Sequence, residues 1–231
     1  MSQLAHYQFA EGVSTITLDD GKVNAMSIAM QEAVHAALDQ AERNGGVVVL
    51  AGNNKLFSAG FDLKVFQTGG EELRKMLRGG MELSQRLIEF PTPIVAAATG
   101  HAMAMGFFLV LSCDYRVGTN TDAKFCANEV AIGLTVPYYA VELCRQALAP
   151  NSLFRAINLA ETFSGQDAIA AGILDVTVAQ NNVVTTALDK AKALRQLNLK
   201  AYKATKDRAK AHIYTALNRA LAADVEAWHS R

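Results

Sequence analysis

Short apolar runs alternate with amphipathic stretches along most of this 231-residue chain, and this alternation restricts the fold more than any other feature. Residues 13–18 alternate apolar and polar side chains, whereas residues 47–50 and 94–98 are continuous apolar runs typical of buried strands. Residues 27–43 and 71–90 instead repeat their apolar side chains at helical spacing. Strands that alternate with helices predict an α/β fold with mostly parallel, buried sheets.

The last part of the chain differs, because it shows no strand pattern after Val178. We expect residues 182–197 and 200–228 to be helical, with apolar residues at helical spacing at Ile213, Leu217, Leu221, Val225 and Trp228. This periodicity fits docking on the chain's own core and docking on another subunit equally well. We predict a core of residues 1–181, which holds the active site, and a helical oligomerisation region of residues 182–231.

The balance of charges limits the possible partners. Lysine and arginine total 22, aspartate and glutamate also total 22, and only 19% of the residues are charged while 51% are hydrophobic. This composition excludes intrinsic disorder, and it excludes the strong positive field needed for non-specific binding to nucleic acid or to an anionic membrane. We therefore expect neither nucleic-acid nor membrane partners.

Two further features bear on location. Residues 94–113 are long and uncharged enough for a membrane span, but Gly100, His101 and Gly106 interrupt them, so we expect a buried strand, a glycine turn and a buried helix. The first residues have no basic start and no continuous apolar block, so they do not predict a secretory signal. Three widely spaced cysteines without a CxxC pair suggest reduced thiols in the cytoplasm and no metal site.

Two glycine-containing turns follow apolar runs, at residues 56–63 and at residues 100–106. Backbone N–H groups at such turns can point at an anion or at a polarised oxygen, and two turns can supply two convergent donors. Neither turn matches a dinucleotide-binding or Walker motif. Most glycine turns only reverse the chain, so a purely structural role remains open.

Glu129 is the most interesting acid–base candidate because its neighbours, FCANEVAIGL, are largely apolar. Removal from water would raise the pKa of this carboxyl toward the range useful to a general base, although a solvated loop carboxylate remains the plain alternative. We expect Asp114 to form a structural ion pair with a nearby base. We expect His101 to be a hydrogen-bonded core histidine.

Three segments, at residues 57–64 (FSAGFDLK), 91–117 and 125–134, resemble in order and spacing the crotonase superfamily of acyl-CoA enzymes. The resemblance covers residues 13–174, and residues 21–26 and 163–178 support it. It implies a spiral of ββα turns, a CoA thioester substrate, and homotrimers or dimers of trimers built through the helical C-terminal region. It implies no separate cofactor, because coenzyme A is part of the substrate.

The resemblance also assigns roles to individual residues. The thioester oxygen would be held by the backbone N–H groups of Phe61 and Met105, although many relatives have glycine at the position of Met105, and Glu129 would be catalytic. Substrate-binding positions carried over from the family are Lys22, Asn24, Ala25, Ala59, Gly60, Asp62, Leu63, Gly106, Phe108 and Tyr138. The depth of the acyl pocket would depend on Phe66, Met76, Met81, Phe107, Phe108 and Tyr138.

The carboxylates distinguish reactions within this superfamily. Its hydratases use two glutamates to activate water, whereas here Phe108 occupies the first position and only Glu129 remains. Residues 113–116, 128–133 and 137–139 are similar to the Δ3,Δ2-enoyl-CoA isomerases. We predict that Glu129 shifts the double bond of a 3-enoyl-CoA to the 2-trans position. The alternatives are another single-glutamate reaction (hydrolase, lyase or weak hydratase) and a non-catalytic acyl-CoA-binding protein.

Overall fold

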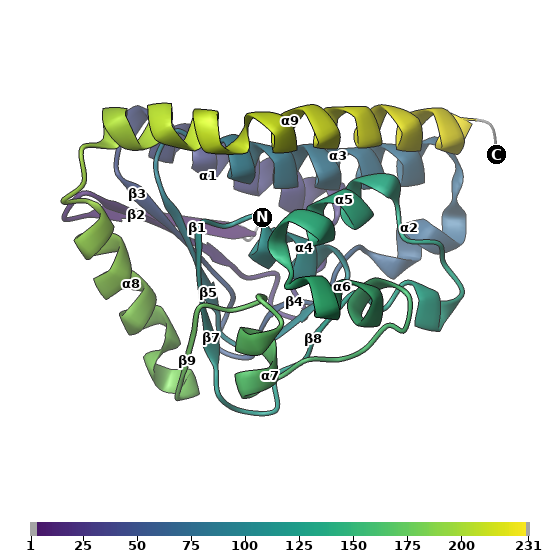
Figure 1. Cartoon of the computed structure of the whole chain (residues 1–231), viewed down its shortest axis with the longest axis horizontal. Coiled ribbons are helices and arrows are strands. Elements are labelled where there is room, and N and C mark those ends of the chain that lie inside the picture. The colour runs from purple at the N-terminus through teal and green to yellow at the C-terminus, as the bar shows by residue number, and fades with distance from the viewer. Residues whose placement is uncertain (1–3, 230–231) are drawn as a thin grey trace.

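The protein, described here from a computed structural model over residues 4–229, is built on two sheets (Figure 1). The larger sheet has the order β1-β2-β3-β5-β7-β9, and only its β1–β2 pair is antiparallel. Its strands are β1 (Ala5–Ala10), β2 (Val13–Leu18), β3 (Val47–Ala51), β5 (Ile94–Ala98), β7 (Tyr115–Thr119) and β9 (Val176–Val178). The predicted mostly parallel α/β fold is confirmed.

The smaller sheet, β4-β6-β8, arises from a repeated unit. After each of β3, β5 and β7, the chain forms a short strand in the smaller sheet and then continues into a helix. These strands are β4 (Leu56–Ser58), β6 (His101–Met103) and β8 (Phe125–Cys126). The long helix after β4 is α3 (Gly70–Glu89), which a short helix precedes. The helix after β6 is α4 (Met105–Leu111), and the helix after β8 is α5 (Tyr138–Ala147), which a short 3-10 helix precedes. This repetition is the spiral of ββα turns that the resemblance implied.

The remaining helices surround this spiral (Figure 1). They are α1 (Ile28–Asn44), α2 (Leu63–Thr68), α6 (Pro150–Ile157), α7 (Gly165–Ala170), α8 (Val183–Leu194), α9 (Leu199–His229) and the short 3-10 helices η1 (Val130–Ile132) and η2 (Gln180–Asn182). Strand β5 and helix α4 confirm the buried strand and helix expected within residues 94–113, whereas residues 101–103 of the expected glycine turn form the short strand β6. Within residues 4–229, no helix is long and apolar enough to cross a membrane. Each of the three cysteines is buried and free.

Both faces of the larger sheet are buried along its central strands β3 and β5, which explains why these two strands are continuously apolar. In β3, Val48 and Leu50 point into the main core, whereas Val47 and Val49 belong to a second apolar cluster. Helix α8 covers this second cluster with small residues on one side. A parallel sheet covered on both faces has no polar face, so its strands need no alternation.

Helix α9 runs along one edge of the molecule, where it packs against α3 and α5 (Figure 1). Leu217 is fully buried in the main core, and Ile213, Leu221 and Trp228 pack partly against it. These apolar positions therefore dock on the chain's own core. A role of residues 182–231 in oligomerisation stays a prediction, and residues 1–3 and 230–231 of the two expected regions lie outside the described residues.

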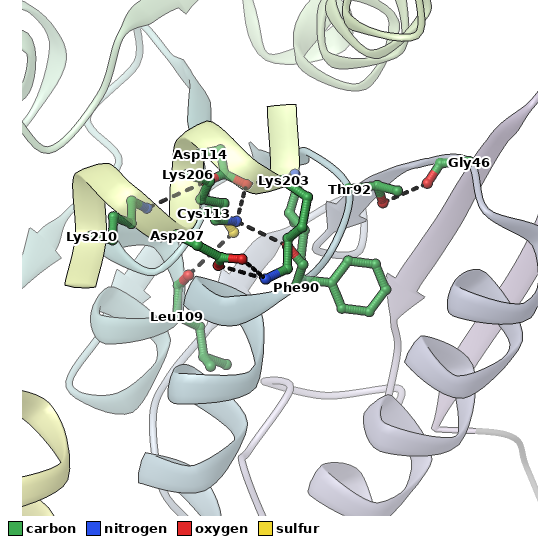
Figure 2. Close-up of polar contacts among 11 residues, drawn as sticks. Gly46, Phe90, Thr92, Leu109, Cys113, Asp114, Lys203, Lys206, Asp207 and Lys210 are labelled. Atoms are coloured by element: carbon green, nitrogen blue, oxygen red, sulfur yellow. Dashed lines mark hydrogen bonds and ion pairs between the residues drawn. The ribbon is translucent and has the colours of Figure 1, made fainter. Parts of the chain in front are cut away.

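A buried ion pair fixes the first half of α9 (Figure 2). The ammonium of Lys206, whose side chain is 3% exposed, lies 3.0 Å from one carboxylate oxygen of Asp114 and 3.2 Å from the carbonyl of Phe90. Lys210 lies 3.4 Å from the other oxygen. The expected structural pair of Asp114 is confirmed, and its bases come from a helix about 90 positions away along the chain.

His101 contradicts the expectation of a core histidine. It begins β6 with its side chain exposed, and its Nδ1 accepts a hydrogen bond from the backbone N–H of Lys124 at 2.9 Å. Successive strand residues point to opposite faces, so the apolar neighbour Ala102 is buried while His101 is not.

Candidate active site

The two glycine turns meet in the structure. Gly60 has a φ of +95°, and a Cβ atom placed on it would lie 2.9 Å from both the Cβ of Ala104 and the carbonyl oxygen of Met103. The same atom would lie 3.4 Å from the backbone nitrogen of Met105. Glycine is therefore required at this position, because its conformation and the close approach of the second turn leave no room for a side chain.

The backbone N–H groups of Phe61 and Met105 are available at this contact. Met105 is the first residue of α4, so its N–H has no partner inside the helix. Within residues 4–229 the structure gives neither N–H a hydrogen-bond acceptor. The positive φ that the turn needs falls on Ala104, at +47°, and not on Met105. Met105 therefore needs no positive φ, and a side chain at this position is compatible with the turn.

Ser58 and Gly106 hold the two turns together. A Cβ atom on Gly106 would lie 2.6 Å from the carbonyl oxygen of Ser58, so α4 packs directly on β4. The hydroxyl of Ser58 donates to the carbonyl of Asn24 at 2.6 Å and accepts from the N–H of Gly60 at 3.2 Å. The role of Gly106 seen here is close packing beside the turn.

Asn24 supports the first turn from below. Its side chain is fully buried, and its amide donates to the carbonyls of Leu18 at 3.0 Å and Phe57 at 3.1 Å. Its Oδ1 accepts from the N–H of Asp20 at 3.1 Å. The amide of Asn24 is thus hydrogen-bonded to backbone groups below the turn.

A cavity of about 450 Å³, a size typical of small-molecule sites, opens beside these turns. Its lining includes Phe61, Phe108 and Glu129, which together with the N–H of Met105 we call the catalytic end. It also includes Leu73, Arg74 and Leu77 of α3 and Trp228 of α9, which we call the distal wall. The remaining lining residues are Phe66, Gly70, Met81, Leu134, Thr135 and Pro137.

Glu129 is the only carboxylate among the described residues that line this cavity. It is 8% exposed, and its Oε2 has no hydrogen-bond partner within residues 4–229. Burial raises the pKa of Glu129 to about 7. The solvated alternative is therefore wrong, and the site holds an unpaired carboxyl that changes charge near neutral pH.

The loop around Glu129 is fixed at both ends. Glu129 directly precedes η1, and its carbonyl accepts from the N–H of Leu134 at 2.9 Å. Beyond Leu134, at the start of α5, the N–H groups of Tyr138 and Tyr139 donate to the two carboxylate oxygens of Asp224 at 2.9 and 2.8 Å. The loop that carries the base is thus tied to α9.

A larger cavity, of about 650 Å³, lies elsewhere. It is lined by the first half of α9, by α5 and by the segment around Asp114. Its lining includes Asp114, Lys206 and Lys210, whose charges are already paired with one another. It contains neither of the two turns nor an unpaired carboxylate among its lining residues. The smaller cavity is therefore the candidate active site.

Some predicted site residues lie away from the cavity lining. Tyr138 is 61% exposed and Leu63 is 65% exposed. Asp62 accepts from the N–H of Lys64 and so caps α2, a helix that the sequence pattern did not indicate. Lys22, Ala25 and Ala59 likewise do not line the cavity. Of the residues expected to set the pocket depth, Phe66, Met81 and Phe108 line it, whereas Met76, Phe107 and Tyr138 do not.

The distal wall is the part that sequence reasoning missed. Leu73 and Leu77 are four residues apart on α3, a spacing that signals a helix face but not what the face contacts. The sequence pattern placed Trp228 on the apolar face of a helix but did not indicate that it lines the cavity. No three His, Cys, Asp or Glu side chains of the described part are grouped to hold a metal ion.

Comparison with known proteins identifies the family. The model of the enoyl-CoA hydratase/isomerase family matches residues 8–231. The chain belongs to this family. The resemblance to the crotonase superfamily is thereby confirmed, and this enoyl-CoA hydratase/isomerase family member is an acyl-CoA-processing enzyme.

Similar proteins carry both activity names. A probable enoyl-CoA hydratase of Bacillus subtilis is 29% identical over 79% of this chain and 70% of its own length. The crystal structure of the Mycobacterium ulcerans enoyl-CoA hydratase EchA3 matches with a TM-score of 0.94 and 42% identity, covering 98% of this chain and 99% of that one. A Mycobacterium tuberculosis protein matches with a TM-score of 0.93 and 40% identity over the whole of both chains, and its two structures name it an enoyl-CoA isomerase in one case and a probable enoyl-CoA hydratase in the other.

Proposed function

We propose that this family member is an enoyl-CoA isomerase, which moves the double bond of a 3-enoyl-CoA to the 2-trans position. The observation that carries the proposal is the unpaired carboxyl of Glu129, the single carboxylate among the described residues that line the cavity. The same lining includes Phe108, which stands at the position that the resemblance assigns to the first glutamate of the hydratases. A phenyl ring cannot polarise water. One base beside two backbone donors is suited to removing a proton and returning it elsewhere.

The proposed reaction begins with the thioester oxygen between the N–H groups of Phe61 and Met105. Glu129 takes a proton from C2, and the electron pair of that C–H bond flows into a dienolate whose negative charge rests on the thioester oxygen. The protonated Glu129 then returns the proton at C4, which leaves the double bond between C2 and C3. By analogy with measured oxyanion holes, each N–H donor contributes about 3 kcal/mol.

The environment of Glu129 supports this cycle. A base whose pKa is about 7 is present in both protonation states near neutral pH, so it can accept and then release a proton without a large cost in either step. The apolar lining of Phe61, Phe66 and Phe108 keeps water away from the carboxyl. Exclusion of water favours return of the same proton over addition of a water molecule.

The decisive experiment supplies the wild-type protein with a 3-enoyl-CoA and, separately, with a 2-trans-enoyl-CoA. We expect the 3-enoyl substrate to give the conjugated 2-trans product, followed by its ultraviolet absorbance, while the 2-trans substrate gains water slowly or not at all. Faster hydration than isomerisation would reject the proposal in favour of a hydratase. Release of free coenzyme A without double-bond migration would indicate a hydrolase.

We further propose a homotrimer or a dimer of trimers. Several large apolar side chains stand on the surface of the single chain, among them Phe154 and Leu159, each 62% exposed, and Ile132, 53% exposed. Exposed apolar patches on a single chain mark contact surfaces. Sedimentation at micromolar concentration should show three or six chains, and a monomer would contradict the proposal. The cytoplasmic location and the lack of nucleic-acid, membrane and separate cofactor partners remain predictions.

A further inference from the structure

Two residues of the distal wall differ in position from the other two. Trp228 and Arg74 line the cavity of the candidate active site, and both also line a second cavity of about 400 Å³. The second cavity is lined mainly by charged and polar side chains, among them Glu32, Lys75 and Arg78. The indole of Trp228 therefore forms part of the partition between an apolar and a polar space.

Asp224 holds this partition in place. It lies one helical turn before Trp228, so the two side chains project from the same side of α9. Its carboxylate, in a residue that is only 3% exposed, accepts the first two N–H groups of α5 at 2.9 and 2.8 Å. This contact caps α5 and at the same time fixes the last turns of α9 against the loop that follows Glu129.

Arg74 is a weaker candidate for the same role. Its guanidinium is paired with Glu71 at 2.8 Å on the same helix, and its side chain is 34% exposed. The long, flexible side chain of an arginine can move aside at little cost, whereas the rigid indole of Trp228 on a clamped helix cannot. The rigid part of the partition is therefore Trp228.

We propose that Trp228, positioned by Asp224, determines the length of acyl chain that the enzyme accepts. This inference rests on the proposed use of the cavity for an acyl-CoA. A short chain extends from the catalytic end without reaching the indole. A longer chain meets it, and its further methylene groups gain no more burial.

The test measures dissociation constants by calorimetry for saturated acyl-CoAs of increasing length, so no turnover is needed. In the wild type, each buried methylene should tighten binding by up to about fourfold until the chain reaches Trp228, after which affinity levels off. Trp228→Ala should move this plateau by about two or three methylenes and tighten binding of the longest chains by about tenfold or more. Affinity for the shortest chains should stay within about twofold of the wild type.

Trp228 is the only tryptophan of the chain, which gives a second readout. Its fluorescence in the wild type should shift on binding of long acyl chains and not of short ones. Trp228→Leu keeps an apolar side chain and covers the case in which the alanine variant does not fold. Its plateau should lie between those of the wild type and the alanine variant.

Asp224→Asn tests the positioning role, with Asp207→Asn as the matched control because Asp207 lies on the same helix and forms an ion pair with Lys203. We expect Asp224→Asn to move the plateau in the same direction as Trp228→Ala. In the double variant, Asp224→Asn should shift the plateau little beyond its position in Trp228→Ala alone. Asp207→Asn should leave the dependence of affinity on chain length unchanged. An unmoved plateau in Asp224→Asn would overturn the role of Asp224.

Two results would overturn the role of Trp228, and they are distinguishable. If the wild type binds acyl-CoA but both Trp228 variants keep its length profile, this inference is wrong and the proposed function stands. If the wild type binds no acyl-CoA of any length, the proposed function fails and the inference fails with it.

Discussion

The catalytic end and the distal wall of one cavity are built in different ways. Phe61, Met105 and Glu129 stand on the turns and the loop that follow β4, β6 and β8, three neighbouring strands of one small sheet. The distal wall joins α3 to the far end of α9, about 150 positions later. The first arrangement fixes backbone groups through the sheet itself, whereas the second depends on how one long helix docks. Chemistry and substrate size are thus under separate structural control.

The largest expected effect concerns the base at the catalytic end. Glu129→Gln preserves shape but removes the proton acceptor, so turnover should fall by about 10² or more while acyl-CoA affinity stays within a few fold. Steady-state kinetics and calorimetry on the same preparations measure both quantities. Glu72→Gln, which changes an exposed carboxylate on α3, is the matched control and should behave as the wild type. Unchanged isomerisation in Glu129→Gln would reject Glu129 as the base.

The next effect tests how firmly α9 is docked. Lys206→Ala leaves the buried carboxylate of Asp114 with a more distant and partly exposed ammonium, that of Lys210, so the free energy of unfolding should fall by about 3 kcal/mol. Lys210→Ala, the matched change on the exposed side of the same cluster, should cost about 1 kcal/mol or less. Urea unfolding measures both. Equal losses in the two variants would show that burial of Lys206 does not set the strength of this contact.

A pH dependence of stability should arise at the catalytic end. Because burial raises the pKa of Glu129 to about 7, the folded chain keeps a proton that the unfolded chain loses near pH 4.5. Stability should therefore fall as pH rises from about 4.5 to about 7, by up to about 3 kcal/mol, and then stay level with respect to this group. The Glu129→Gln variant lacks this carboxyl. Its stability relative to the wild type, measured by thermal unfolding, should therefore increase as the pH rises from about 4.5 to about 7. A pH-independent difference would mean that the carboxyl is not desolvated.

The smallest effect concerns the strained turn at the catalytic end. Ala104 has a φ of +47°, a conformation that costs an alanine about 1 to 3 kcal/mol and a glycine little. Ala104→Gly should raise the free energy of unfolding by about 1 kcal/mol, after the greater freedom of glycine in the unfolded chain is subtracted. Chemical denaturation measures the change. A loss of stability would show that the Cβ contact of Ala104 with the Gly60 turn outweighs the strain.

The sequence indicated much of the larger sheet and most of the long helices because their patterns are local. The expected helix at residues 27–43 appears as Ile28–Asn44, and Ser27 caps it by accepting from the N–H of Met30 at 3.2 Å. Helix α2 was missed because six residues are too few to show a period, and its cap, Asp62, resembles a turn residue. The strands of the small sheet are only two or three residues long, which is also too short for alternation to show.

For the site, the residue types at the catalytic end can be read from the sequence: a carboxyl among apolar neighbours, two glycine turns after strands, and Phe108 in place of a second carboxyl. The contacts come from the folded chain: the two turns touch, Glu129 is desolvated and unpaired, Trp228 lines the cavity, and Asp224 binds the start of α5. The physical reason is that backbone turns and helical periods depend on near neighbours in the chain. Burial, a raised pKa and a cavity wall depend on atoms brought together from distant segments, and no local pattern encodes those contacts.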